Sequence, residues 1–189
     1  GVVELAEAGV ITNKKKTLHP GKFIATFLMG TRRLYDFVDN NPDVEMHPVD
    51  YTNDPFVVAQ NEKLMSINSA IQVDFMGQVN AEVIGGKQFS GIGGQVDFVR
   101  GARRSKGGKS IIALPSTASG GKVSRIVCEL DPGSAVSTSR NDVDYIVTEY
   151  GIAYLRGKTL RQRAEELISI SHPDFQAELT EKLTKMNWF

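Results

Sequence analysis

The stretch from Lys87 to Phe98 (KQFSGIGGQVDF) is the part of the sequence best suited to chemistry. It holds three glycines in four residues, namely Gly91, Gly93 and Gly94. A glycine leaves its backbone N–H uncovered, so these amides can approach an oxygen that carries developing negative charge. The single basic residue before them, Lys87, could contact a phosphate, a carbonyl or a carboxylate of the same ligand. The pattern indicates an oxyanion or thioester site, and the alternative is a tight turn with a solvated lysine.

Two common glycine motifs do not fit this region. Residues 91–93 begin like the dinucleotide-binding pattern GxGxxG, but Val96 stands where the last glycine is required. Residues 108–110 end like a P-loop, yet Arg103 stands where its first glycine belongs. NAD and ATP are therefore disfavoured. The nearby basic residues could meet the phosphates of an adenosine nucleotide, or could form a solvated loop; they are Arg100, Arg103, Arg104, Lys106 and Lys109.

The histidines give little support for a metal centre. His19, His47 and His172 are scattered along the chain, and each precedes a proline. None has a second His or Cys at a spacing typical of zinc ligands, so we expect no metal. The sequence also lacks a GxSxG nucleophile elbow, so a serine hydrolase of the α/β type has no candidate nucleophile.

Residues 91–94 are called the glycine loop. The elements that must position this loop follow from hydrophobic spacing. A hairpin turn is expected at residues 77–78, and the apolar run 96–99 interrupts the glycine-rich region without an assigned element. The alternation predicts an α/β fold with a largely parallel open sheet and flanking helices, in which ligands gather at the carboxyl ends of strands. Strands are expected at 22–28, 44–49, 64–74, 110–114, 123–130 and 144–148, and helices before Gly9 and at 32–40, 54–61 and 159–169.

Composition bounds the remaining choices. The 189 residues suffice for one α/β domain, so residues 1–189 are treated as one unit. Lys plus Arg equals Asp plus Glu at 22 each, which leaves no net field to attract nucleic acid or a membrane surface. The single cysteine cannot form an internal disulfide, and no membrane-length apolar stretch or signal peptide occurs, so we expect a cytoplasmic protein. The chain begins inside an amphipathic run without Met, which indicates a longer polypeptide.

Four strings carry a family resemblance that spans nearly the whole chain. They are LHPGKFIATFLMG (18–30), INSAIQVDFMGQVNAE (67–82), KQFSGIGGQVDFVRGA (87–102) and SRNDVDYIVTEYGIAYLRGKTLRQRA (139–164). Together they resemble the C-terminal domain of acetyl-CoA hydrolase/transferases, which are family I coenzyme A transferases. Within that family the chain is most similar to the 4-hydroxybutyrate and butyrate CoA-transferases, and the resemblance implies a CoA-transferase domain of the NagB/RpiA-like kind.

The resemblance implies a two-domain enzyme that moves coenzyme A between carboxylic acids through a glutamyl-CoA thioester. Its nucleophilic glutamate is expected upstream of Gly1, so none of Glu4, Glu7, Glu45, Glu62 or Glu82 replaces it. CoA is then a substrate, and no cofactor is bound permanently. The positions that match the family's site are Asn68, Lys87 and Gly91 as CoA contacts, Gly93 and Gly94 around the thioester oxygen, Asn53 as an amide that orients the acyl group, and Glu149 as a supporting carboxylate.

Three further expectations follow from the resemblance. The partners are an acyl-CoA, a small carboxylic acid and the N-terminal domain of the same enzyme, and the full-length enzyme is expected to be a homo-oligomer. Gln72 departs from the glutamate usual in similar enzymes, either as a surface or supporting change or as one that tunes activity. Two alternatives stay open: an acyl-CoA hydrolase, in which water resolves the thioester, and a non-catalytic CoA-binding module.

Overall fold

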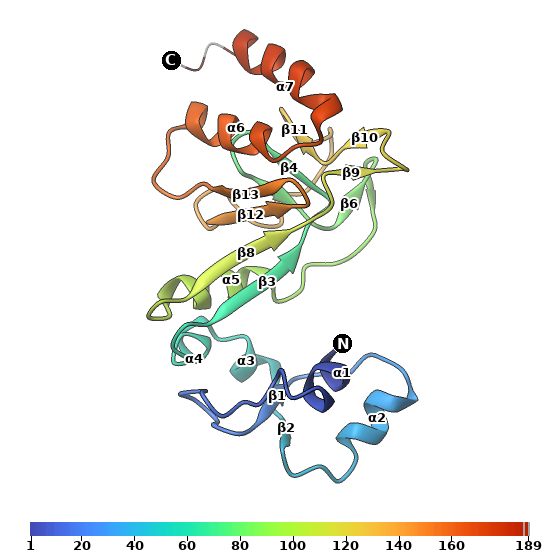
Figure 1. Cartoon of the computed structure of the whole chain (residues 1–189), viewed down its shortest axis with the longest axis vertical. Coiled ribbons are helices and arrows are strands. Elements are labelled where there is room, and N and C mark those ends of the chain that lie inside the picture. Colours follow the sequence, from blue (N-terminus) through green and yellow to red (C-terminus); the bar gives the residue numbers. More distant parts are fainter. Residues whose placement is uncertain (187, 189) are drawn as a thin grey trace.

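The computed structural model describes residues 1–186 and 188 of the chain. Figure 1 shows its N-terminal elements gathered at one end and the C-terminal helices at the other. The helices are α1 (Val2–Glu7), α2 (Arg32–Val38), α3 (Val49–Thr52), α4 (Pro55–Val58), α5 (Gln95–Arg104), α6 (Leu160–Ser169) and α7 (Pro173–Lys185). The strands are β1 (Phe23–Ala25), β2 (Val44–Met46), β3 (Met65–Ser69), β4 (Gln72–Asp74), β5 (Val79–Asn80), β6 (Val83–Ile84), β7 (Lys87–Gln88), β8 (Lys109–Ala113), β9 (Thr117–Ala118), β10 (Val123–Ser124), β11 (Ile126–Val127), β12 (Tyr145–Thr148) and β13 (Gly151–Tyr154).

A four-stranded sheet in the order β13-β12-β8-β3 forms the centre of the molecule. β3, β8 and β12 run parallel, and β13 joins the edge as an antiparallel hairpin partner of β12. One face of this sheet buries Ile112, Ile146 and Ala153, and α5 and α6 pack beside it. The prediction of an α/β fold with a largely parallel sheet and flanking helices is confirmed.

The opposite face of the same sheet is apolar and open. Ile67, Ile111, Tyr145 and Tyr154 are paired in one row across the four strands. Ile67 is 70% exposed, and Ile152, one pair further along β13, is 66% exposed. Parallel sheets in proteins are normally covered on both faces, so this surface has the character of a contact surface.

Two of the predicted strands each divide into two shorter strands. The run 64–74 divides into β3 and β4, which belong to different sheets, because the chain turns at Ala70 and Ile71. The run 123–130 likewise divides into the short strands β10 and β11. The predicted turn at Gly77 is confirmed, since it joins the antiparallel pair β4 and β5 and has φ of 83°.

Of the two helices that pack beside the central sheet, α6 was predicted from the sequence and α5 was not. α5 was not predicted, although Val96 and Val99 lie on neighbouring turns of it and Val99 is fully buried. α6 was predicted, because Thr159 caps it and exchanges hydrogen bonds with Gln162 in a capping box. The helices α3 and α7 and the strand β13 were not predicted.

The N-terminal lobe holds α1, α2 and the parallel pair β1 and β2. β1 and β2 are shorter than the strands predicted there, and α2 begins at Arg32 as expected. α3 and α4 lead from this lobe to the central sheet, where α4 packs against α5. Across residues 1–186 and 188, the structure contains no helix of sufficient length and apolar character to traverse a bilayer.

Candidate functional site

The carboxyl ends of the three parallel strands bring distant polar residues to one edge of the sheet. Asn68 lies near the end of β3, Ser116 follows β8, and Glu149 follows β12. The glycine loop reaches the same edge, because Gln95 Nε2 at the start of α5 donates a 2.8 Å hydrogen bond to the backbone oxygen of Ser69. This edge is where ligands bind in sheets of this type.

A hairpin presents the glycine loop. β6 and β7 pair around Gly85 and Gly86, whose φ values of 56° and 72° fit a two-residue hairpin turn that requires positive φ at both positions. After β7, the amides of Phe89 and Ser90 both donate to the backbone oxygen of Glu82, at 2.7 and 3.1 Å. The chain then passes through residues 91–93 without regular structure and enters α5 at its N-cap, Gly94.

The amides of the glycine loop are free to meet a ligand. Within residues 1–186 and 188, no atom accepts a hydrogen bond from the amide of Gly91, Gly93 or Gly94. Gly91 and Gly93 are exposed, and a Cβ on either would meet open space. The loop borders a pocket of about 110 Å³, lined by Ala81, Glu82, Gly91, Ile92, Gly93, Gln95, Val96 and Ser137. An oxygen of a ligand can therefore reach the amides of Gly91 and Gly93 directly.

Gly94 also begins a helix, whose N-terminus lies next to this pocket. The N-cap of α5 has no side chain that could accept a hydrogen bond from the first turn. Unpaired amides at a helix N-terminus attract negative charge. Asp97 in the first turn offsets part of that effect and accepts a long 3.5 Å hydrogen bond from Asn53 Nδ2.

Asn53 is brought to the glycine loop by α3, whose C-cap it forms. Its Nδ2 lies so close to Gly94 that a Cβ built there would be only 2.3 Å away. Its Oδ1 accepts a 2.9 Å hydrogen bond from the hydroxyl of Thr52. The side-chain amide is therefore oriented and sits beside the loop, although its place at the end of α3 also fits a structural role.

Asn68 and Lys87 occupy different parts of this region. Asn68 Nδ2 donates a 2.8 Å hydrogen bond to Ser66 Oγ on the same strand. Lys87 is exposed on β7 opposite Ile84, and it has no salt bridge to any residue that the structure describes. An exposed lysine without a protein partner is available to an anionic ligand.

Glu149 is held by a residue that the sequence did not single out. Ser116 donates to its carboxylate twice, from Oγ at 2.7 Å and from the backbone amide at 2.8 Å. The hydroxyl hydrogen bond is the main cause that lowers the pKa of Glu149 from its ordinary value. Glu149 is therefore an oriented carboxylate that stays ionised, which suits it to support other groups rather than to carry protons.

A larger pocket of about 640 Å³ lies next to the glycine loop. Gln72 lines it and is paired with Asp131, because Gln72 Nε2 donates to the Asp131 carboxylate at 2.9 Å. Gln72 is also only 7% exposed, so it is not a surface residue. The residues that line this pocket are Ser69, Ala70, Ile71, Gln72, Ala81, Ile84, Gly85, Phe89, Ser90, Ala118, Ser119, Val123, Ser124, Arg125 and Asp131.

The basic cluster is largely neutralised by acidic neighbours. Arg100 and Arg103 both contact Asp142, at 3.1 and 3.3 Å. The other basic side chains also have partners, since Lys106 pairs with Glu62, the guanidinium of Arg104 stacks over the ring of Phe56, and Lys109 lies over the ring of Tyr145. The cluster also lies mainly on α5 and not on a solvated loop. These contacts favour a structural role over phosphate binding.

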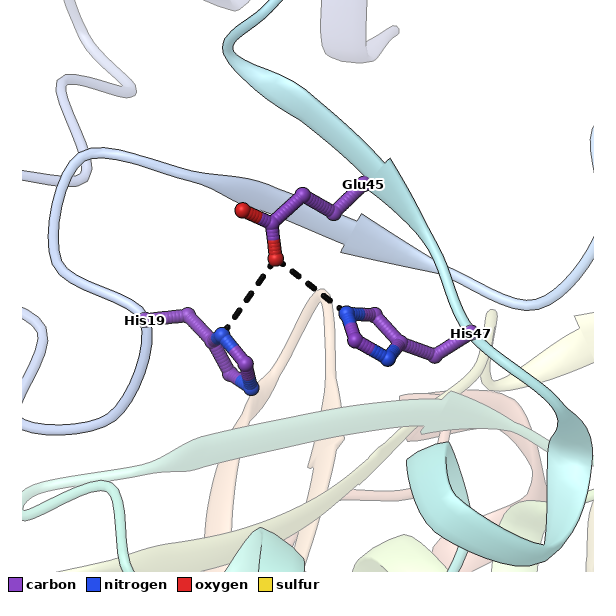
Figure 2. Close-up of side chains that lie close together, drawn as sticks. All are labelled: His19, Glu45 and His47. Carbon is purple, nitrogen blue, oxygen red and sulfur yellow. Dashed lines mark hydrogen bonds and ion pairs between the residues drawn. The ribbon is translucent and has the colours of Figure 1, made fainter.

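The interpretation of the histidines as scattered is wrong for two of them. His19 and His47 both contact one oxygen of Glu45, and Figure 2 shows the two rings facing that carboxylate. Sequence spacing missed this cluster because the pairing of β1 with β2 creates it. Glu82 was also missed as part of the site, since it lines the smaller pocket and is 6% exposed. A buried carboxylate has no distinctive sequence signal in this stretch.

Comparison with known proteins identifies the family. Residues 30–183 match the family model described as "Acetyl-CoA hydrolase/transferase C-terminal domain". The chain belongs to the acetyl-CoA hydrolase/transferase family. The resemblance read from the four strings is thereby confirmed.

Relatives in the acetyl-CoA hydrolase/transferase family include both CoA-transferases and acetyl-CoA hydrolases. A 4-hydroxybutyrate coenzyme A transferase of Clostridium kluyveri is 65% identical over 98% of this chain, which covers 43% of that relative. An acetyl-CoA hydrolase of Candida albicans is 35% identical over 62% of this chain and 22% of that relative. The crystal structure of RipA from Yersinia pestis matches 100% of the chain and 42% of its own length, with 47% identity and a TM-score of 0.93. The C. kluyveri and Y. pestis proteins thus match nearly all of this chain, and the chain spans about two fifths of their length.

Proposed function

We propose that this chain is the CoA-binding half of a CoA-transferase that exchanges CoA between an acyl-CoA of the 4-hydroxybutyryl or butyryl class and an acid such as acetate. The observation that carries the proposal is the set of unbonded amides at Gly91, Gly93 and Gly94, at the carboxyl edge of the sheet and beside Asn53. Amides placed in this way can stabilise the oxyanion of a tetrahedral intermediate at a thioester carbonyl. CoA is a substrate in this reaction and not a resident cofactor.

Each site residue has a role that its position supports. Lys87 on β7 binds a carbonyl or anionic group of CoA, and Asn68 contributes a second polar contact near the end of β3. Asn53 orients the acyl group next to Gly94. Glu149 supports the edge of the site as an ionised carboxylate fixed by Ser116. The larger pocket beside Phe89 offers room for the pantetheine arm.

The nucleophile is a glutamate upstream of Gly1. Its carboxylate oxygen attacks the acyl carbonyl of acyl-CoA. The tetrahedral intermediate collapses with cleavage of the C–S bond, which releases CoA as a thiolate and leaves the acyl group on the glutamate as a mixed anhydride. The thiolate then attacks the glutamyl carbonyl and releases the first acid as a carboxylate, which leaves a glutamyl-CoA thioester. An incoming carboxylate repeats the two steps in reverse, so the thioester energy is conserved.

The open sheet face supports a two-domain arrangement. Ile67 and Ile152 lie on an apolar surface that a further layer of protein would cover. We propose that the N-terminal domain of the same polypeptide supplies that layer and the second wall of the site. The complete enzyme is proposed to be a cytoplasmic homo-oligomer.

Transfer and hydrolysis differ in the acceptor of the glutamyl group. The greater identity to the 4-hydroxybutyrate coenzyme A transferase than to the acetyl-CoA hydrolase favours transfer. In the complete polypeptide, loss of butyryl-CoA is expected to require acetate and to yield acetyl-CoA in equal amount. Loss at the same rate without acetate would instead indicate a hydrolase. A protein that consumes no acyl-CoA under either condition, yet binds CoA, would be a non-catalytic module.

A further inference from the structure

A cluster in the N-terminal lobe lies apart from the residues proposed to bind CoA. His19 Nδ1 lies 3.4 Å from Glu45 Oε2, and His47 Nε2 lies 3.2 Å from the same oxygen. One ligand atom from each side chain falls within 4.8 Å of the others. In Figure 2 both imidazole rings point from their own segments toward the carboxylate between them. Three chemically suitable donors therefore converge on one point.

The two separations to Glu45 Oε2 match the edges of a zinc coordination sphere. Zinc bonds to nitrogen and oxygen of about 2.0–2.1 Å at tetrahedral angles place neighbouring ligand atoms about 3.3 Å apart. The observed 3.2 and 3.4 Å lie on either side of that value. Two imidazoles and one carboxylate also form a donor set that suits zinc and related divalent transition metals.

Tyr51 provides the outer contact that such a site requires. Its hydroxyl oxygen lies 2.7 Å from His19 Nε2, the ring nitrogen that faces away from Glu45. If that nitrogen carries the proton and donates it to Tyr51, Nδ1 keeps its lone pair for a metal. Tyr51 also stacks on the ring of His47, with the ring centroids 4.9 Å apart. One tyrosine thus orients both histidines.

The cluster is reachable from solvent. The side chains of His19, Glu45 and His47 are 23%, 35% and 29% exposed, so an ion can enter, and water or a ligand can occupy a fourth position. Lys22 lies 3.9 Å from Glu45 Oε1, the oxygen that does not face the histidines. The lysine therefore does not stand between the three donor atoms.

From this geometry we propose that His19 Nδ1, Glu45 Oε2 and His47 Nε2 form a binding site for Zn²⁺ or a similar divalent transition metal. A bound ion would connect the segment before β1, the strand β2 and the turn into α3. It would thereby fix the start of the helix that ends at Asn53. The site is independent of the proposed CoA chemistry, because none of its three ligands takes part in that reaction.

The test is calorimetric titration of ZnCl₂ into the complete natural polypeptide after removal of metals with a chelator. We expect saturable binding that Glu45→Gln and His47→Gln each weaken at least tenfold. Tyr51→Phe, which removes only the hydroxyl, is expected to weaken binding about tenfold by freeing His19. His172→Asn is the matched control, because His172 also precedes a proline and its N-capping role can be kept by Asn.

A second readout is independent of calorimetry. Co²⁺ bound by two histidines and a carboxylate is expected to give visible absorption bands that Glu45→Gln and His47→Gln abolish and His172→Asn keeps. Absence of saturable Zn²⁺ binding would overturn the proposal and leave a hydrogen-bonded cluster only. Binding that is equally strong in the wild type, Glu45→Gln and His47→Gln would also overturn it. Circular dichroism of each variant shows whether the fold is intact, and Tyr51→Phe remains decisive if a ligand variant does not fold.

Discussion

A Cβ added to Gly94 would lie 2.3 Å from Asn53 Nδ2. The side-chain amide of Asn53 can therefore lie against the glycine loop only because residue 94 has no side chain. This contact joins the N-terminal lobe to the start of α5. It gives Gly94 a steric role in addition to the role of its amide. The present position of the Asn53 side chain therefore requires a residue without a Cβ at position 94.

Gly94→Ala is expected to displace Asn53 or the loop, because real Cβ contacts do not occur at that separation. A displacement of about 1 Å at a reacting centre lowers activity by roughly 100-fold. The measurement is kcat/KM for CoA transfer in the complete polypeptide. The matched control is the pair Asn53→Ala and Asn53→Ala/Gly94→Ala. If the clash with Asn53 is the cause, the double variant is no slower than Asn53→Ala alone, whereas multiplicative losses would contradict this explanation.

Ser116→Ala is expected to raise the pKa of Glu149 toward its ordinary value, because the hydroxyl hydrogen bond is the main cause that lowers it. A lowered folded-state pKa stabilises the protein above the unfolded value of about 4.3, and this contribution is lost as the pH falls through the folded-state pKa. The variant should therefore be less stable than the wild type at pH 7, and the difference should shrink in acid. Urea unfolding over this pH range measures it. In a Glu149→Gln background the pH dependence of the Ser116 effect should disappear, and its persistence would point to another carboxylate.

Gln72→Glu is expected to destabilise the protein at neutral pH, because it places a second carboxylate against Asp131 where Gln72 now donates a 2.9 Å hydrogen bond. The loss should be about 1–3 kcal/mol in the free energy of unfolding, the usual result of leaving a buried polar group without its partner. The double variant Gln72→Glu/Asp131→Asn restores one donor and one acceptor and should recover most of the loss. Equal instability of the double variant would show that repulsion between the two carboxylates is not the cause of the loss.

Ile152→Glu is expected to have different effects in two contexts. In a protein that consists of residues 1–189 alone, the side chain of Ile152 is 66% exposed. The substitution should therefore change the free energy of unfolding of that protein by no more than about 0.5 kcal/mol. In the complete polypeptide the same charge would be buried against the N-terminal domain, with an expected loss above about 2 kcal/mol. Thermal and urea unfolding of both proteins provide the comparison. The same small change in both would mean that the N-terminal domain does not cover this face.

Lys87→Ala is expected to weaken CoA binding by about 10- to 100-fold, since hydrogen bonds to charged groups contribute about 1.5–3 kcal/mol. Calorimetry with CoA and the complete polypeptide measures this change. Lys14 is a matched control, because it is another exposed lysine and it lines neither of the two pockets beside the glycine loop. An equal effect of Lys14→Ala would indicate general attraction of charge and not a specific contact of Lys87.

The strands β8 and β12 and the glycine-rich loop could be predicted from the sequence, whereas the strand β13 and the contacts between distant strands could not. The runs that form β8 and β12 are compact and apolar, and the glycines at 91–94 stand close together in the sequence. Both signals are local, so they can be recognised without knowledge of the fold. The helix α5 was not recognised in the sequence because Val96 and Val99 stand among charged residues and Gly101, which weakens the apolar spacing of a helix. The 33-residue separation of Ser116 and Glu149 is closed only by the parallel pairing of β8 and β12. The cluster on Glu45 depends in the same way on β1 and β2.

The most direct test of the central claim is NMR titration of the complete polypeptide, labelled with ¹⁵N-glycine, with butyryl-CoA. The account predicts that the amide signals of Gly91, Gly93 and Gly94 move as a group on saturation. Gly107 and Gly157, which lie in turns and line neither of the two pockets beside the glycine loop, should not move. Saturable binding that leaves the signals of Gly91, Gly93 and Gly94 unchanged would contradict the assignment of these amides to the thioester oxygen.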